Sequence, residues 1–189
     1  SEITVITVTY DGSVYGFPFT GNTWFMYYDK SVFSDEDIKS LDAMLEKGKV
    51  AFPLDNSWYI AAFYVANGCT LFGENGGDAD AGFDFSGDKA VAVTNYLVDL
   101  IANPNFSNGD VGTNADAKAF FSGTWDYQKA VDAYGDNLGI AAPPSINIGG
   151  ELKQMKAFAG SKAIGVNPAT ALYKEHPEIA VALAAYLGG

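Results

Sequence analysis

The prediction of fold and function starts from one stretch of the sequence, Ala117-Lys-Ala-Phe-Phe-Ser-Gly-Thr-Trp-Asp-Tyr127. Its first part, Ala117–Phe121, is predicted to form a strand that ends at the following Ser-Gly pair, and a helix is expected over Gln128–Tyr134. Trp125 and Tyr127 then lie on the strand-to-helix turn, with a carboxylate between them. Two rings beside a carboxylate suit a ligand with one apolar face and one hydroxylated edge. A lone tryptophan is more often a core residue, and that interpretation stays open here.

Strand-like and helix-like segments alternate along the chain, which predicts an α/β fold. Strands are expected at 3–9, 14–19, 24–28, 50–52, 117–121, 138–142 and 154–165, the last broken at Gly160. Helices are expected at 34–47, 58–67, 88–101 and 128–134, and after a cap at 167–170 as far as 187. Asp11-Gly12 predicts a tight hairpin and Gly149-Gly150 a turn. The segment 73–88 is expected to be a surface loop or hairpin, and 103–115 a loop.

Two helices carry apolar residues at helical spacing. The predicted buried stripe of the 88–101 helix is Val91, Val93, Leu97, Leu100 and Ile101. That of the last helix includes Leu172, Ile179, Ala180 and Leu183.

Composition narrows the range of partners. The 189 residues are 48% hydrophobic, which indicates a globular chain. The net charge of −12 repels nucleic acid and anionic membranes, so neither is expected as a partner. All 11 basic residues are lysines. Because arginine is the usual residue for two-point capture of phosphate or carboxylate, its absence favours a neutral ligand.

Catalytic and metal-binding patterns are absent from the sequence. His176, the sole histidine, lies in a charged segment typical of a helix surface, and Cys69, the sole cysteine, is expected to be a small buried residue. No Gly-x-Ser-x-Gly elbow, phosphate loop or dinucleotide fingerprint occurs. The acids between Asp78 and Asp88 lack the spacing of a calcium loop and fit an ordinary solvated loop. We therefore expect no enzyme, cofactor or metal site. No stretch is long and apolar enough to span a bilayer, and Ser1-Glu2-Ile3 lacks the basic region and apolar run of a signal peptide, a segment that secreted proteins lose on maturation.

Each tryptophan directly follows a small polar triplet: Gly21–Thr23 before Trp24, Asp55–Ser57 before Trp58, and Ser122–Thr124 before Trp125. Sugars are bound in this way, with rings stacked on C–H faces and with amides and carboxylates at the hydroxyls. Trp24 is the weakest of the three, because its place in an alternating strand favours the core.

Several passages, in order along the chain, resemble the maltose/maltodextrin-type extracellular solute-binding proteins of ABC importers (family 1). The passages are Val8–Phe19 with Trp24–Lys30, Val50–Tyr59, Ser122–Asp126, Gly135–Pro144 and Phe158–Pro168. The resemblance covers almost the whole chain from about Val8, whereas Ile3–Val8 does not match the family.

The resemblance implies a type II periplasmic-binding-protein fold, in which crossing strands join two α/β lobes that close on a sugar. Residues 1–20 would be crossing or hinge strands, 21–158 the second-lobe α/β domain, and 159–189 the return crossing and the start of a first-lobe helix. The lobe would be incomplete relative to the two-lobe family, because most of the first lobe is missing. The chain is therefore expected to be a piece of a longer receptor.

The function implied by the resemblance is sugar binding, for maltose or maltodextrin, as the receptor component of an ABC carbohydrate importer. Its partners would be a maltooligosaccharide or related neutral sugar and the permease subunits, and the protein would be a monomer. It would be extracellular, held at the cell surface by a lipid anchor, or periplasmic. The alternative is a free-standing secreted glycan-binding or hydrolase-associated module.

The resemblance also implies roles by position. The implied ligand-binding residues are Trp58, Trp125, Asn56, Tyr127, Asp55 and Asn22. Trp58 and Trp125 match stacking rings, with Tyr127 close to the second, and Asn56 matches a residue that binds hydroxyls. Asn22 falls near the hinge at a position where the family often has a carboxylate.

Overall fold

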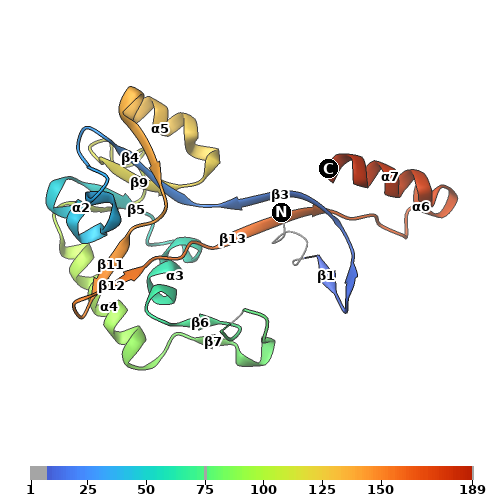
Figure 1. The fold of residues 1–189 in the computed structure, drawn as a ribbon, viewed down its shortest axis with the longest axis horizontal. Coiled ribbons are helices and arrows are strands. Elements are labelled where there is room, and N and C mark those ends of the chain that lie inside the picture. The colour runs from blue at the N-terminus through green and yellow to red at the C-terminus, as the bar shows by residue number, and fades with distance from the viewer. Residues whose placement is uncertain (1–7, 75, 189) are drawn as a thin grey trace. The chain divides into compact units, whose positions relative to one another are not determined.

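The computed structural model describes residues 8–74 and 76–188. They form two compact units, shown in Figure 1. Residues 24–158 make up one, which we call the α/β unit. The other, the strand-pair unit, consists of residues 8–23 and 159–188.

The α/β unit is built on a five-stranded sheet with the order β10-β4-β9-β5-β8. Its strands are β4 (Phe25–Asp29), β5 (Val50–Phe52), β8 (Phe106–Asn108), β9 (Ala119–Ser122) and β10 (Leu138–Ala141). Strand β5 runs parallel to both β8 and β9, and β4 is antiparallel to β9 and β10. Both β5 and β9 are buried along their whole length, as expected of strands covered on two faces.

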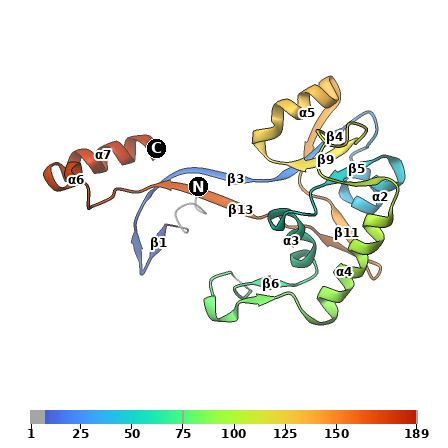
Figure 2. The same cartoon turned by 180° about the vertical axis from the view of Figure 1, so that it is seen from behind.

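Helices cover both faces of this sheet (Figures 1 and 2). They are α2 (Leu41–Lys47), α3 (Ser57–Ala66), α4 (Gly87–Ala102) and α5 (Tyr127–Tyr134). Successive strand residues point to opposite faces, so Phe120 joins the core under α5, where its ring lies 5.1 Å from that of Tyr27. Phe121 joins the larger core under α2, α3 and α4, 4.7 Å from Phe52. The predicted α/β class is confirmed.

Trp24 belongs to the larger core and is only 1% exposed. Its ring lies 5.3 Å from Tyr59, and its indole Nε1 donates to the carbonyl of Trp58 over 3.1 Å. The core interpretation of Trp24 is therefore correct.

The structure corrects two of the segments predicted within the α/β unit. The expected loop 103–115 contains β8, which sequence patterning missed because the strand is short and polar. The expected helix 34–47 is interrupted: a 3₁₀ turn η1 (Asp37–Lys39) precedes α2, which begins at Leu41. The Ser40 side chain accepts from the backbone N–H of Ala43 and caps α2, so this serine ends one segment and starts the next.

The remaining elements of the α/β unit are hairpins and short turns. Strands β6 (Thr70–Leu71) and β7 (Phe83–Asp84) pair on either side of η2 (Ala79–Ala81). This agrees with the loop or hairpin expected there. Strands β11 (Ser145–Ile148) and β12 (Glu151–Gln154) pair around the predicted glycine turn, although neither strand was predicted. The 3₁₀ turns η3 (Thr124–Asp126) and η4 (Gly135–Asn137) flank α5.

In the strand-pair unit, β3 (Phe17–Thr23) pairs antiparallel with β13 (Ala159–Ile164). Gly160 lies inside β13, so the predicted break there is wrong; the pairing continues through it opposite Asn22. Strands β1 (Thr9–Tyr10) and β2 (Ser13–Val14) form the predicted hairpin, with φ of 47° and 74° at Asp11 and Gly12. Residues 3–7 of the first expected strand lie outside the described residues.

The expected last helix is two helices, α6 (Ala171–Glu175) and α7 (Pro177–Gly188). A residue that precedes proline is disfavoured in helical geometry, and His176 accordingly leaves it with φ −141° and ψ 65°. The predicted stripe is largely wrong, because Leu172, Ile179 and Leu183 are exposed; the buried residues of α7 are Ala180 and Ala184. Across the described ranges, no helix has the length and apolar character needed to cross a membrane.

Candidate functional site

A cavity of about 290 Å³ opens at the carboxyl ends of β5, β8 and β9. It is lined by Pro53, Asn56, Tyr59, Gly109, Asp110, Thr113, Phe121, Ser122, Trp125 and Asp126. In open α/β sheets, ligands bind outside the carboxyl ends of the strands. The cavity therefore occupies the position where this fold class places its binding sites.

The loops around the cavity are tied to one another by backbone and amide hydrogen bonds. The Asn108 side-chain oxygen accepts from the Leu54 N–H over 2.8 Å, and Gly109 N–H donates to the Phe52 carbonyl over 3.2 Å. Asn56 caps α3, since its side-chain oxygen accepts from Trp58 N–H. The cap occupies the oxygen of Asn56, whose amide nitrogen carries the hydrogen-bond donors that a hydroxylated ligand requires.

Trp125 supplies the apolar part of the site. It lies in η3, between β9 and α5, as the opening stretch predicts. Its side chain is 53% exposed, in contrast to the buried Trp24. Phe121 and Tyr59, which also line the cavity, are buried. Of these three aromatic lining residues, Trp125 has the ring that is open for stacking.

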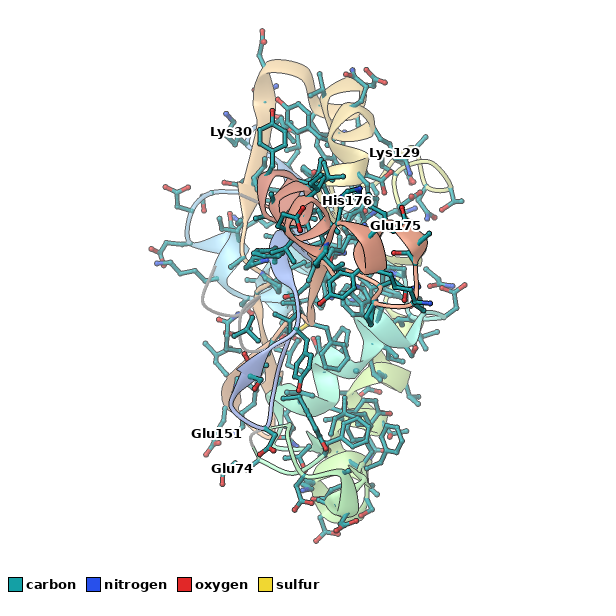
Figure 3. All side chains as sticks on the ribbon, turned by 90° about the vertical axis from the view of Figure 1, so that its right-hand side faces the viewer. Lys30, Glu74, Lys129, Glu151, Glu175 and His176 are labelled. Atoms are coloured by element: carbon teal, nitrogen blue, oxygen red, sulfur yellow. The ribbon has the colours of Figure 1, made fainter. Side chains whose placement is uncertain are left out.

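Lys129 of α5, which is labelled in Figure 3, forms ion pairs with two carboxylates of the site. Its Nζ lies 2.7 Å from Asp110 Oδ2 and 3.1 Å from Asp126 Oδ1. Asp126 Oδ2 accepts from Ser122 Oγ over 2.6 Å, and Asp110 Oδ1 accepts from the N–H groups of Gly112 and Thr113. Two acids and one lysine leave this cluster with one net negative charge at neutral pH.

The pKa values follow from these contacts. Burial raises the pKa of the Asp110 carboxyl, but the Lys129 ammonium and the two backbone N–H groups outweigh burial, so the pKa lies below its ordinary value. The hydrogen bond to Asp110 raises the pKa of Lys129. Burial raises the pKa of Tyr59. At neutral pH the site therefore offers an ionised Asp110 acceptor and a protonated Tyr59 hydroxyl.

Of the six residues singled out in the sequence, the cavity brings together Asn56 and Trp125. Trp58 is half-buried, and its ring lies 5.7 Å from that of Phe158, outside the cavity lining. Asp55 is exposed in the loop before α3, and the Tyr127 side chain is 53% exposed at the start of α5.

Asn22 lies in β3 of the strand-pair unit, where it is half-buried.

Five polar residues of the cavity are not among the six ligand-binding residues expected from the sequence: Tyr59, Asp110, Thr113, Ser122 and Asp126. Ser122 and Asp126 were visible as neighbours of Trp125 in the opening stretch. Asp110 follows β8, the unrecognised strand, so no pattern placed it at a strand end. Recognition of β8 as a strand would have indicated that residue.

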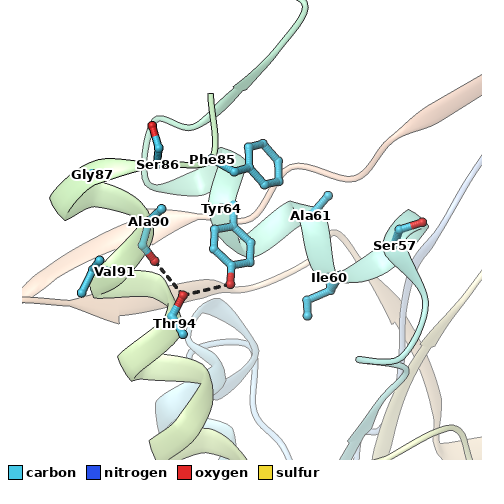
Figure 4. Close-up of a pocket in the computed structure, with 10 residues that line it drawn as sticks. All are labelled: Ser57, Ile60, Ala61, Tyr64, Phe85, Ser86, Gly87, Ala90, Val91 and Thr94. Atoms are coloured by element: carbon cyan, nitrogen blue, oxygen red, sulfur yellow. Dashed lines mark hydrogen bonds between the residues drawn. The ribbon is translucent and has the colours of Figure 1, made fainter. Parts of the chain in front are cut away.

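A second cavity, of about 450 Å³, lies between α3 and α4 (Figure 4). The ring of Tyr64 stacks on Phe85 at 5.2 Å, and its hydroxyl hydrogen-bonds to Thr94 Oγ1. The lining is mainly apolar and contains no charged residue. It therefore fits a hydroxylated ligand less well than the cavity beside Trp125.

Neither Cys69 nor His176 lines either of these two cavities. Cys69 is a buried free thiol whose pKa is raised by burial. His176 lies between α6 and α7, 3.8 Å from a carboxylate oxygen of Glu178. Within residues 8–74 and 76–188, no group of three or more His, Cys, Asp or Glu side chains is placed to hold a metal ion.

Comparison with known proteins places the chain in a family. A family model described as bacterial extracellular solute-binding protein matches residues 4–189. A curated relative from Streptococcus pneumoniae, a maltooligosaccharide ABC transporter solute-binding lipoprotein, is 28% identical, with 81% of this chain and 41% of the relative covered.

Solved structures agree with this family. One, described as a complex with acarbose, is 57% identical and has a TM-score of 0.88 over 100% of this chain and 50% of its own. The unliganded maltodextrin-binding protein MalE1 from L. casei BL23 shares the fold, at 23% identity and a TM-score of 0.87, with 100% of this chain and 51% of that chain covered. The chain thus spans about half the length of the proteins it matches, and it belongs to the family of bacterial extracellular solute-binding proteins.

Proposed function

We propose that this chain contributes the sugar-binding wall of a receptor that delivers maltooligosaccharides to an ABC importer. The observation that carries the proposal is the half-exposed ring of Trp125 at the rim of a cavity lined with carboxylates, hydroxyls and an amide. A sugar presents apolar C–H faces to such a ring and hydroxyls to the polar groups around it. The lack of arginine supports a neutral ligand.

The relatives support the same ligand class. The Streptococcus pneumoniae relative is named for maltooligosaccharides, and the 57% identical structure is described as a complex with acarbose. We propose that Trp125 stacks on a sugar ring and that Asn56, Asp110 and Asp126 bind hydroxyls. Tyr127, Asp55 and Trp58 would contact more distant parts of the ligand. Asn22 is proposed as a ligand-binding residue from the family resemblance of its position alone.

Calorimetric titration with maltose, maltotriose, maltotetraose and acarbose tests the proposal. Because the relatives are about twice as long, the titration is performed both on this chain and on the product of its whole gene. We expect binding by the whole product and weaker binding by this chain, since closure of two lobes desolvates a ligand more fully than one wall does. Binding of another class of solute with no response to any α-glucan would refute the proposed specificity. Equal affinity of both proteins would support a free-standing glycan-binding module instead.

The Trp125→Ala variant of the whole gene product tests the residue that carries the proposal. Loss of the stacking surface should weaken maltooligosaccharide binding by about 1–3 kcal/mol, the scale of one aromatic contact. Because the Trp125 ring is half exposed, the melting temperature should stay close to that of the wild type. An unchanged affinity would remove Trp125 from the site.

The proposed partners are the permease subunits of the importer, and the proposed location is outside the cytoplasmic membrane, with a lipid anchor like that named for the Streptococcus pneumoniae relative. The receptor is proposed to act as a monomer. Reconstitution with the importer tests the partnership: the sugar-loaded protein should stimulate ATP hydrolysis, and the sugar-free protein should do so less. Size-exclusion chromatography with light scattering tests the monomer.

A further inference from the structure

The Trp125 side chain packs directly on the backbone of Gly123. A Cβ atom at position 123 would lie 2.2 Å from Cζ3, 2.3 Å from Cη2 and 2.6 Å from Cε3 of the indole. These distances are far below a carbon–carbon contact of about 3.5–4.0 Å. The six-membered part of the indole therefore occupies the space that any side chain at position 123 would need.

The backbone of Gly123 does not itself require glycine. Its φ of −106° and ψ of −166° are extended values that other residues adopt. Glycines at turns such as Gly12 and Gly149, by contrast, have φ of 74° and 64°. The absence of a side chain at position 123 therefore makes room for the Trp125 ring. It is not required by the backbone conformation.

The peptide beneath the ring is held from several sides. The hydroxyl of Tyr27, a fully buried residue of β4, donates to the Gly123 carbonyl over 2.9 Å. The same carbonyl accepts from Asp126 N–H over 3.1 Å. The Asp126 carboxylate in turn accepts a hydrogen bond from Ser122 Oγ and forms an ion pair with Lys129. The surface on which the indole rests is therefore anchored to the sheet on one side and to α5 on the other.

We propose that Gly123 is a positioning residue for ligand binding, because its bare backbone holds the Trp125 ring in a fixed orientation before any sugar arrives. The expected effect on sugar affinity rests on the proposed function. The position of the ring rests on packing alone. A ring ordered in advance loses less side-chain entropy on binding, so preorganisation strengthens binding without a new contact.

The Gly123→Ala variant of the whole gene product tests this role. The added methyl group displaces the ring, so we expect roughly tenfold weaker binding of maltotetraose, a ratio that corresponds to about 1.4 kcal/mol. The same substitution in a Trp125→Ala background should have no further effect on affinity, since the ring is no longer there. Wild-type affinity in Gly123→Ala, or an equal loss in both backgrounds, would overturn the proposal.

Acrylamide quenching of tryptophan fluorescence provides a readout that needs no ligand. Trp24 is buried and Trp58 half-buried, so Trp125 is the tryptophan most accessible to the quencher. Gly123→Ala should raise the quenching constant in the absence of sugar; no change would overturn the proposal. If the wild type binds no sugar, the proposed function fails, and quenching still decides the position of the ring.

Two other glycines provide matched controls. A Cβ at Gly77 meets no atom within 4 Å, so Gly77→Ala should change neither affinity nor quenching. A Cβ at Gly139 would lie 2.4 Å from the ring of Tyr28, which is buried in the sheet. Gly139→Ala should therefore lower the melting temperature without raising the quenching of Trp125.

If Gly123→Ala fails to fold, a second variant decides the matter. The double variant Gly123→Ala with Trp125→Ala removes the group that the new methyl strikes. It should fold with a melting temperature close to that of Trp125→Ala alone. A double variant that stays unfolded would show that glycine is needed for another reason and would overturn the proposal.

Discussion

At the scale of single residues, Lys129 holds the polar half of the site together. It is the cation between Asp110 and Asp126, and these two carboxylates come from different parts of the chain. Without it, two acids would face each other beside the cavity, and like charges at close range disfavour ionisation. The Lys129 ammonium helps to lower the pKa of Asp110 and so keeps that carboxylate in the form that accepts hydrogen bonds from hydroxyls.

Replacement of Lys129 by glutamine should destabilise the protein in a pH-dependent way. The pKa of Asp110 is lowered on folding, so its stabilisation is present above the ordinary carboxyl pKa of about 3.9 and is lost as pH falls through the lowered folded value. The pKa of Lys129 is raised, so its contribution persists below about pH 10.4 and is lost as pH rises through the raised value. Near pH 7 the cost should be on the order of 1 kcal/mol, since the pair is about one-third exposed and partly screened.

Thermal melts of wild type and Lys129→Gln from pH 2 to 8 measure this difference. The two curves should converge toward the acid end. Lys49→Gln, which breaks a more exposed pair with Asp116, is the matched control and should have a smaller effect near pH 7. A constant difference between wild type and Lys129→Gln down to the lowest pH would contradict the assignment.

Two of the tryptophans, Trp58 and Trp125, should respond differently to truncation. Trp58 packs against the larger core and near Phe158, so Trp58→Ala should lower the free energy of unfolding by about 2–3 kcal/mol. Trp125→Ala should change it by less than about 0.5 kcal/mol, because its ring is half exposed. Urea titrations followed by circular dichroism measure both values. Equal losses would mean that Trp125 also serves the core.

At the scale of elements, helix α4 carries apolar residues on two adjacent faces, of which only one is buried. Val93, Leu97 and Leu100 are buried against the sheet, whereas Val91, Val98 and Ile101 are exposed. The predicted stripe was therefore correct for three positions and wrong for Val91 and Ile101. Periodicity identifies an apolar arc, but the neighbouring elements decide which part of that arc meets the core.

Two adjacent positions of α4 provide a direct test. Leu97→Ala should cost about 2–5 kcal/mol, as large-to-small changes in a core do. Val98→Ala removes an exposed side chain and should change stability by no more than about 0.5 kcal/mol. Chemical denaturation of both variants gives the comparison. A large loss for Val98→Ala would show that this face of α4 is covered in solution.

At the scale of the whole molecule, the two units differ in how much they bury. The α/β unit contains both hydrophobic clusters, and its central strands are fully buried. In the described part of the strand-pair unit, the buried hydrophobic residues are Ala180 and Ala184, two small side chains. Since apolar burial is the main favourable term in folding, local stability should differ between the units.

Hydrogen exchange should reveal that difference. Amides of β4, β5 and β9 should be the slowest to exchange, and those of α6 and α7 should exchange many times faster. Mass spectrometry of peptides from this chain measures the two regions separately. Equal protection of α7 and β9 would contradict the expectation and indicate additional packing around the last helix.

Local signals in the sequence determined a large part of the structure. The Asp11-Gly12 turn, the glycine turn at 149–150, the α/β class and the place of Trp125 between a strand and a helix all follow from residues close together in the chain. Such features depend on short-range backbone preferences, which a sequence displays directly. The order of the family passages likewise indicated the family.

Only the tertiary structure decided which residues meet. The sequence offered Trp58 and Trp125 as a pair, but the strand order β9-β5-β8 instead brings Asp110 and Ser122 to the cavity beside Trp125. Asp110 and Lys129 form their ion pair across 19 positions of sequence, because β8 ends and α5 begins at the same edge of the sheet. The packing of the Trp125 ring on Gly123 likewise cannot be recognised from the sequence pattern. Contacts of this kind depend on the pairing and packing of distant segments, and they exist only once those segments have come together.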